Sequence, residues 1–199
     1  MRNMLKKEKQ TICLNIILQS LLFIFLVFAD RLTKNIAVSK LKGNDPTVLI
    51  TDILEFRYIE NSGAAFGIFQ NRQWLFYILT VLILTAIIIL FISLNIKLGK
   101  YSKLIVSQNS AFKQKTFTSI LILNYILVTL AAGAVGNLID RISLKYVVDF
   151  IYFKLVDFPV FNFADICVTL AAAALIIFFI VYKEDENFSI IWSKKEKKK

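Results

Sequence analysis

Apolar residues along this chain gather in four long runs that polar segments separate. The runs lie near 11–29, 74–94, 116–135 and 164–182. A helix needs about 20 residues to cross roughly 30 Å of hydrocarbon, and each run is close to that length. The pattern therefore predicts an all-α membrane protein with four transmembrane helices. No internal repeat is visible, so we expect a single domain over residues 1–199.

The first apolar run follows basic residues, which is also the pattern of a secretory signal peptide. The run is longer than the apolar core of such peptides. It ends in Phe28-Ala29-Asp30-Arg31, where no pair of small residues marks a cleavage site. We therefore interpret this run as a retained helix.

The polar segment 31–73 contains the stretch TVLITDILEFRYIEN at 47–61. Its β-branched and aromatic residues alternate loosely with polar ones, which is typical of short strands. The apolar content argues against an unstructured loop. We expect a small β-rich segment that rests at the membrane interface.

Composition and charge support a membrane protein and predict how it is oriented. The chain is 57% hydrophobic, its mean hydropathy is +0.66, and its formal net charge is +10. Lysine and arginine dominate the amino-terminal tail, the 95–115 segment and the carboxyl-terminal tail, whereas segments 31–73 and 137–163 mix basic and acidic residues. The positive-inside rule then predicts that both termini and a 95–115 loop are cytoplasmic. Segments 31–73 and 137–163 would face outward.

Several kinds of chemistry are disfavoured by the same composition. The basic tail SKKEKKK comes with no DNA-binding motif, so we expect no nucleic-acid partner and only attraction to anionic membrane lipids. Cys13 and Cys167 both fall in expected helices without metal-ligand spacing, so neither a disulfide framework nor a metal site is expected. The chain has no histidine, which excludes His-based zinc sites and Ser-His triads.

Charged residues next to the apolar runs are the first candidates for a site, because ionisable groups at membrane depth are costly. Asp30 and Lys34 follow the first run at i,i+4 spacing and are expected to pair. A structural ion pair is the simpler interpretation of these two residues. In AAGAVGNLIDRI (131–142), Gly133 and Gly136 permit close helix packing.

The residues that follow these glycines are interpreted as support for the fold rather than as chemistry. Asn137 is expected to cap or cross-link backbone after the third helix, and Asp140 is expected to pair with Arg141. The small-residue run ENSGAAFGIF (60–69) admits two interpretations: a tight turn packed on the helices, or an exposed edge that accepts an extended peptide.

The stretch VVDFIYFKLVDFPVFNFAD (147–165) carries three carboxylates, Asp149, Asp157 and Asp165, close to the membrane. A peptide hydrolase without histidine or metal ligands can use two carboxylates that share a proton, one activating water and the other polarising the carbonyl. Spacing alone does not say which two would pair. A cation pathway or transporter that uses the aspartates, or a non-catalytic scaffold, stays open on these residues alone.

Five blocks spread over the whole chain resemble the prolipoprotein signal peptidase family, also called signal peptidase II, of bacterial membrane aspartyl peptidases. They are DRLTK (30–34), NSGAAFG (61–67), GNLIDR (136–141), VVDF (147–150) and FNFAD (161–165). The resemblance implies that Asp149 and Asp165 are the catalytic pair and that Asp157 is a bystander. It also implies a substrate-binding or supporting role for Asp30, Lys34, Asn61, Gly63, Asn137, Asp140, Arg141 and Asn162.

The resemblance further implies a reaction and a location. The substrate would be a diacylglyceryl-modified prolipoprotein, cut just before the lipidated cysteine by water that the aspartate pair activates. No cofactor would be needed. We expect a monomer in the bacterial cytoplasmic membrane, with the active site near the outer face and with lipid-modified precursors and membrane lipids as its partners.

Overall fold

A computed structural model describes residues 2–63, 73–108 and 111–182, with side chains described at 10–63, 73–99 and 115–182. It consists of four long helices, three strands and one short 3-10 helix. In chain order these are α1 (Arg2–Leu41), β1 (Thr47–Ile50), β2 (Leu54–Asn61), α2 (Gln73–Gln108), α3 (Ala111–Leu144), β3 (Val147–Phe153), η2 (Lys154–Val156) and α4 (Phe163–Tyr182).

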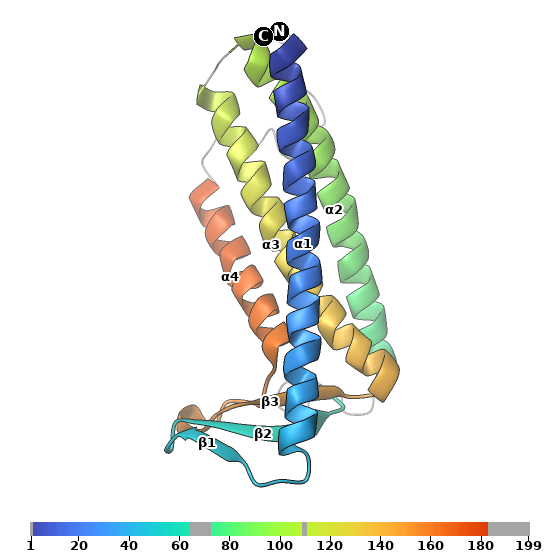
Figure 1. Ribbon diagram of the computed structural model, residues 1–199, viewed down its shortest axis with the longest axis vertical. Helices are drawn as coiled ribbons and strands as arrows, with labels where there is room; N and C mark the ends of the chain where they lie inside the picture. The colour runs from blue at the N-terminus through green and yellow to red at the C-terminus, as the bar shows by residue number, and fades with distance from the viewer. Residues whose placement is uncertain (1, 64–72, 109–110, 183–199) are drawn as a thin grey trace.

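The four helices form an elongated bundle that is capped at one end by the sheet (Figure 1). Helices α1 and α3 run toward the sheet, and α2 and α4 run away from it. In the described part of the chain, four segments are long and apolar enough to cross a membrane: Gln10–Leu41, Gln73–Gly99, Lys115–Leu144 and Phe163–Tyr182. The start of α1 and the end of α4 lie on the side opposite the sheet.

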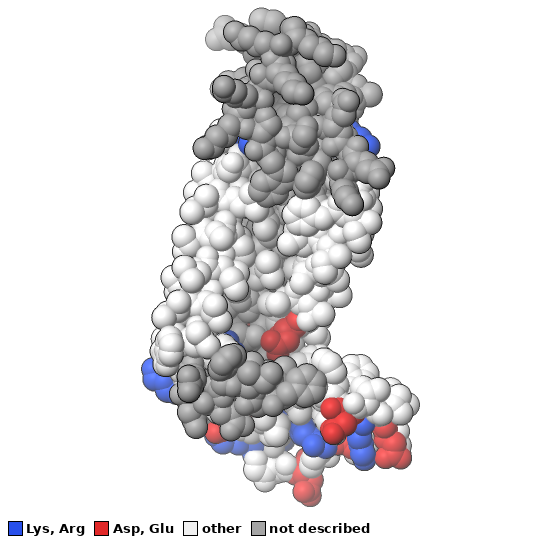
Figure 2. Space-filling view, turned by 180° about the vertical axis from the view of Figure 1, so that it is seen from behind, with Lys and Arg blue, Asp and Glu red and all other residues white. Residues whose placement is uncertain are grey.

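The outer surface of the bundle is apolar, as expected for helices in contact with lipid. Ile24, Ile89 and Ile180 are more than 60% exposed, at 62%, 64% and 69%. Figure 2 shows a broad uncharged band over the helices. Its acidic residues gather at the sheet end, and its basic residues lie both there and at the opposite edge of the band. The four expected helices are therefore confirmed as long apolar segments that could cross a membrane.

Three helices are longer than the apolar runs that predicted them. α1 continues to Leu41, α2 to Gln108 and α3 to Leu144, beyond the expected ends at 29, 94 and 135. Hydropathy marks where the hydrocarbon ends, but lysine, arginine, glutamine and leucine remain good helix formers beyond that point. The expectation of a 95–115 loop was therefore wrong, and so was the expectation that Asn137 follows the third helix.

The sheet has the strand order β1-β2-β3, and both pairs are antiparallel. The first two strands confirm the β-rich segment expected in 31–73. The third was missed, because VVDFIYF was interpreted as part of an outward loop although its valine, isoleucine and aromatic residues favour a strand. β3 aligns Asp149 opposite Ile59 of β2 and Val147 opposite Asn61.

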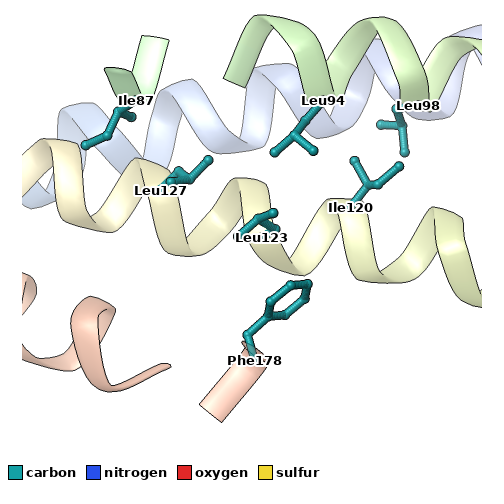
Figure 3. Close-up of a cluster of buried hydrophobic side chains, with 7 residues drawn as sticks. All are labelled: Ile87, Leu94, Leu98, Ile120, Leu123, Leu127 and Phe178. Carbon is teal, nitrogen blue, oxygen red and sulfur yellow. The ribbon is translucent and has the colours of Figure 1, made fainter. Parts of the chain in front are cut away.

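The main hydrophobic core lies in the half of the bundle away from the sheet. Figure 3 shows how side chains of α2, α3 and α4 meet there: Ile87, Leu94, Leu98, Ile120, Leu123, Leu127 and Phe178. Close to the sheet, α3 and α4 instead approach through glycine. A Cβ on Gly133 would lie 2.6 Å from the carbonyl oxygen of Ala164, so only glycine fits there. The close packing expected at this position is confirmed.

Candidate active site

Asp149 projects from β3 into the junction between the sheet and the bundle, where it is only 2% exposed. Two side-chain amides hold its carboxylate. The Nδ2 of Asn61 donates to Oδ2 at 2.8 Å, and the Nδ2 of Asn162 donates to Oδ1 at 2.6 Å. Asn61 is at the end of β2, so the pairing of β2 with β3 brings this amide to the carboxylate.

Asp165 lies in the first turn of α4 and helps to start that helix. The backbone N–H of Asp165 donates to the Oδ1 of Asn162 at 3.1 Å, and its own Oδ2 accepts from the backbone N–H of Asn162 at 3.1 Å. This reciprocal pair is a capping box, with asparagine at the N-cap and aspartate three residues later. The remaining oxygen, Oδ1, accepts from the Nδ2 of Asn137 at 2.8 Å.

Asn162 therefore contacts both carboxylates. Its side-chain nitrogen bonds Asp149 and its backbone nitrogen bonds Asp165. Burial, followed by the negative charge of Asp165, raises the pKa of Asp149 to about 7, against the lowering effect of the amides of Asn61 and Asn162. Near neutral pH Asp149 is therefore partly protonated.

A buried ion network lies behind the two aspartates. The Nζ of Lys34 is 3.1 Å from Asp30, 3.0 Å from Asp140 and 2.9 Å from the Oδ1 of Asn137. Lys34 is 2% exposed, so its charge is balanced inside the protein. The expected pairing of Asp30 with Lys34 is confirmed. Through Asn137 this network also orients the amide that bonds Asp165.

Asp140 pairs with a different arginine from the one expected. Its Oδ1 accepts from Arg31 at 2.5 Å, and its Oδ2 accepts from the backbone N–H of Val148 at 3.1 Å. The predicted Asp140–Arg141 pair was wrong, because neighbouring residues of a continuous helix point in different directions. Asp140 thus joins α1 to the start of β3, next to Asp149.

Arg141 lies beside the aspartate pair without a salt bridge to a described carboxylate. Its guanidinium stacks over the ring of Phe76 at 4.8 Å, and its backbone carbonyl accepts from the hydroxyl of Tyr77 at 2.5 Å. The negative charges of Asp165 and Asp149 act on it through space. Arg141 therefore places a positive charge beside the two carboxylates.

Asp30 has a second function at the start of α4. Its Oδ1 accepts from the backbone N–H of Ala164 at 3.1 Å, which satisfies a further amide at the helix N-terminus. Gly136 makes this contact possible, because a Cβ there would lie 2.7 Å from the Oδ2 of Asp30. The position of α4, and with it Asp165, depends on this close approach.

Gly63 lies at the edge of the described residues, and Asp157 is not part of the hydrogen-bonded site. The backbone N–H of Gly63 donates to the Oδ1 of Asn61 at 3.0 Å, which orients the amide that bonds Asp149. Residues 64–72 lie outside the described residues, so the substrate-edge interpretation of ENSGAAFGIF stays a prediction. Asp157 is exposed at the end of η2 and accepts from the hydroxyl of Tyr152 of β3 at 2.6 Å.

Sequence reasoning missed Arg31, which bonds Asp30, Asp140 and the carbonyl of Gly136. Its signal was present, because Arg31 is a third charged residue in one turn at the end of an apolar run. Gln73 was missed as well; it donates to the carbonyl of Lys145 and joins α2 to the start of β3. Among the described residues, no group of three or more cysteine or acidic side chains could hold a metal ion.

These features define a class: an integral membrane protein that places two carboxylates, both hydrogen-bonded to one asparagine, where a helix bundle meets a small sheet. Residues 22–181 match the sequence profile of the family described as Signal peptidase (SPase) II. The chain belongs to this family of membrane proteases, which remove signal peptides from prolipoproteins.

Individual relatives agree with the family match. A lipoprotein signal peptidase of Clostridium tetani is 39% identical over 162 residues, which cover 80% of this chain and 88% of the relative. One of Clostridium acetobutylicum is 35% identical over 164 residues, covering 81% and 92%. A solved structure described as a bacterial membrane enzyme at 2.3 Å resolution has a TM-score of 0.65 and 30% identity, covering 90% of this chain and 94% of that one.

Proposed function

We propose that this protein is an aspartic endopeptidase that removes the signal peptide from diacylglyceryl-modified prolipoproteins. It cuts the bond before the lipidated cysteine, and Asp149 and Asp165 activate the attacking water. The observation that carries the proposal is that Asn162 bonds the carboxylates of both Asp149 and Asp165, and that burial raises the pKa of Asp149 to about 7. Two such carboxylates supply both an acid and a base without a cofactor.

The reaction needs one proton on the pair. The ionised carboxylate takes a proton from water as the water oxygen bonds to the scissile carbonyl carbon, while the protonated partner donates to the carbonyl oxygen. The C–N bond then breaks as a proton moves from the pair to the leaving nitrogen. The products are a signal peptide with a new carboxyl end and a lipidated cysteine with a free amino group.

The geometry favours Asp165 as the base and Asp149 as the acid. Asp165 is in the first turn of α4, where the helix dipole and the N–H groups stabilise a negative charge. Asp149 is in a strand, is buried, and has the raised pKa of a group that holds its proton near neutral pH. The proton nevertheless belongs to the pair, and the two assignments exchange during the cycle.

The surrounding residues take supporting roles in this proposal. Asn61 and Asn162 orient Asp149, and Asn137 orients Asp165. Arg141, which has no salt bridge to a described carboxylate, is suited to bind a carbonyl or carboxylate group of the substrate near the scissile bond. Lys34 keeps the network behind the pair neutral.

We further propose that the protein works as a monomer in the bacterial cytoplasmic membrane, with the sheet and the aspartate pair at the outer face. The lysine-rich 95–115 segment and both tails support this orientation. A precursor held by its signal helix and lipid would then meet the pair at the edge of the hydrocarbon, without leaving the membrane.

Transport is less well supported than hydrolysis. A relay through the membrane needs ionisable groups at successive depths. Asp30, Asp140, Asp149 and Asp165 instead gather at the sheet end. The described core beyond them contains the apolar cluster in Figure 3 and neutral polar side chains such as Gln19 and Asn124.

The test uses three matched variants, Asp149→Asn, Asp165→Asn and Asp157→Asn, with a lipidated precursor in vesicles. The first two should lower the cleavage rate by at least about a thousandfold, because each removes the acid or the base. Asp157→Asn should cleave like the wild type, because its carboxylate is exposed and bonds Tyr152 rather than a residue of the site. Normal cleavage by either Asp149→Asn or Asp165→Asn, measured by gel shift, would refute the proposal.

A further inference from the structure

The free end of the sheet projects sideways beyond α4 (Figure 1). We call residues 47–54 and 153–158 the sheet lobe. In Figure 2 the projecting part of the molecule is charged on the side away from the bundle and largely uncharged on the side toward it. The exposed apolar residues of the sheet lobe are Val48, Leu49, Ile50, Ile53, Phe153, Leu155, Val156 and Phe158.

A cleft of about 550 Å³ separates the sheet lobe and the loop that follows it from α4. Phe153, Phe158 and Phe161 are on one side, and Ile166 and Leu170 are on the other. The ring of Phe161 packs against those of Phe153 and Phe158 at centroid distances of 6.1 and 5.8 Å. The volume of the cleft falls in the roughly 300–1,000 Å³ range of ligand sites. Most of its wall is apolar.

The cleft connects the aspartate pair to the lipid-facing surface. Asp165 lines it at the start of α4, and Thr169 lines it one helical turn further on. Leu170, also in its wall, is 63% exposed on the surface of a membrane-spanning helix. An apolar chain can therefore lie in the cleft with one end beside Asp165 and the other in the lipid.

We propose that this cleft binds one acyl chain of the precursor's diacylglyceryl group and so positions the lipidated cysteine at the aspartate pair. The inference rests on the proposed function. In that function the lipidated cysteine directly follows the scissile bond, so its acyl chains begin close to Asp165. A single amino-acid side chain is much smaller than the cleft, whereas an acyl chain matches its length, its apolar walls and its path to the lipid.

The first test compares two precursors that share one signal peptide and carry either two palmitoyl or two butyryl chains. The signal helix holds both in the vesicle membrane at equal mole fraction. The wild type should show a KM for the palmitoyl precursor at least about tenfold lower, because a filled apolar site discriminates by chain length. Thr169→Trp, which fills the cleft, should abolish this preference by raising the palmitoyl KM, with kcat changed by less than about twofold.

Ile180→Trp is the matched control, because Ile180 is exposed on the same helix away from the cleft. It should keep the wild-type preference. Equal preferences in Thr169→Trp and the wild type, or no preference in the wild type, would overturn the acyl-chain site and leave the peptidase function intact. Failure of the wild type to cut either precursor would instead overturn the proposed function.

A second measurement does not depend on how the tryptophan variant folds. A precursor with a photoreactive diazirine at the end of one acyl chain is irradiated with the wild-type protein in vesicles, and the labelled peptides are sequenced. Labels within 158–161 or 166–170 are expected. Labels confined to other lipid-facing segments would overturn the inference. So would labelling of the cleft by a diazirine phospholipid that the precursor does not displace.

Discussion

The side-chain nitrogen of Asn162 donates to the Oδ1 of Asp149 at 2.6 Å. The same residue begins α4, and its backbone N–H bonds Asp165. One asparagine therefore starts a helix and fixes both carboxylates relative to each other. Asn162 therefore links Asp149 of the sheet to Asp165 of the membrane helix α4 and holds the two acidic groups near each other.

Replacement of Asn162 should separate these two functions. Asn162→Ser keeps a good N-cap oxygen for α4 but is too short to bond Asp149, whereas Asn162→Ala loses both contacts. Both variants should lower kcat. Both should also move the alkaline limb of the activity profile to higher pH, because the amide of Asn162 lowers the pKa of Asp149. Only the alanine variant should also lose about 1 kcal/mol of stability through the lost cap. Identical melting of the two variants would contradict this division.

The pH dependence of cleavage follows from the shared proton. Because the pKa of Asp149 is raised to about 7, the pair loses its last proton as the pH rises above neutrality. We expect kcat/KM to fall about tenfold for each pH unit on the alkaline side. The profile is measured with one precursor in vesicles of fixed composition. An activity that stays constant well above pH 7 would show that no proton on this pair is required.

Stability should change with pH in the direction set by the same group. The pKa of Asp149 is 3.8 in its ordinary state and about 7 in the fold, so the native protein holds a proton that the unfolded chain releases between these values. The contribution of Asp149 to stability is therefore present at low pH and is lost as the pH rises through about 7. In Asp149→Asn the melting temperature should depend less on pH over this range, because asparagine does not titrate.

The sequence predicted the membrane helices well and their ends poorly. Apolar runs report the thickness of the hydrocarbon, whereas helix ends depend on backbone bonds that continue through polar residues such as those between Asp30 and Leu41. β3 was missed for a related reason. The pattern of VVDFIYF fits a strand, but a strand forms only with a partner, and β2 lies about 90 residues earlier in the chain.

The sequence predicted which residues belong to the site, but not which of them form hydrogen bonds and ion pairs with one another. Spacing correctly paired Asp30 with Lys34, because both are on one helix face. It gave Asp140 the wrong partner, since Arg31 lies 109 residues away on α1 and reaches Asp140 only through helix packing. The bond from Asn162 to Asp149 likewise needs the sheet and the start of α4 together.

Loss of the buried lysine should cost far more than loss of an exposed one. Lys34→Met leaves Asp30 and Asp140 with Arg31 as their remaining described cation, and we expect a loss of about 3–5 kcal/mol. Lys42→Met is the matched control, because its pair with Glu60 is about half exposed and solvent screening leaves it little effect on stability. Thermal melting in one detergent compares the two. Equal destabilisation of the two variants would contradict the burial of Lys34 within its ion network.

Gly136 of α3 lets this helix approach α1 and α4 closely. Gly136→Ala adds a Cβ that would lie 2.7 Å from the Oδ2 of Asp30 and 3.2 Å from the Cβ of Ala164. The helices must then move apart, which weakens the bond from Ala164 to Asp30 that anchors α4 and Asp165. We expect a destabilisation of about 1–3 kcal/mol, together with a lower kcat.

Gly99→Ala provides the comparison, because among the described residues no atom would lie within 4 Å of its added Cβ. Alanine is a better helix former than glycine by roughly 0.5–1 kcal/mol, so this variant should be as stable as the wild type or more so. Opposite shifts in melting temperature for the same chemical change would show that contact at Gly136, rather than helix propensity, limits the substitution. If Gly136→Ala melts and cleaves like Gly99→Ala, α4 does not depend on the close approach of Gly136 to Asp30.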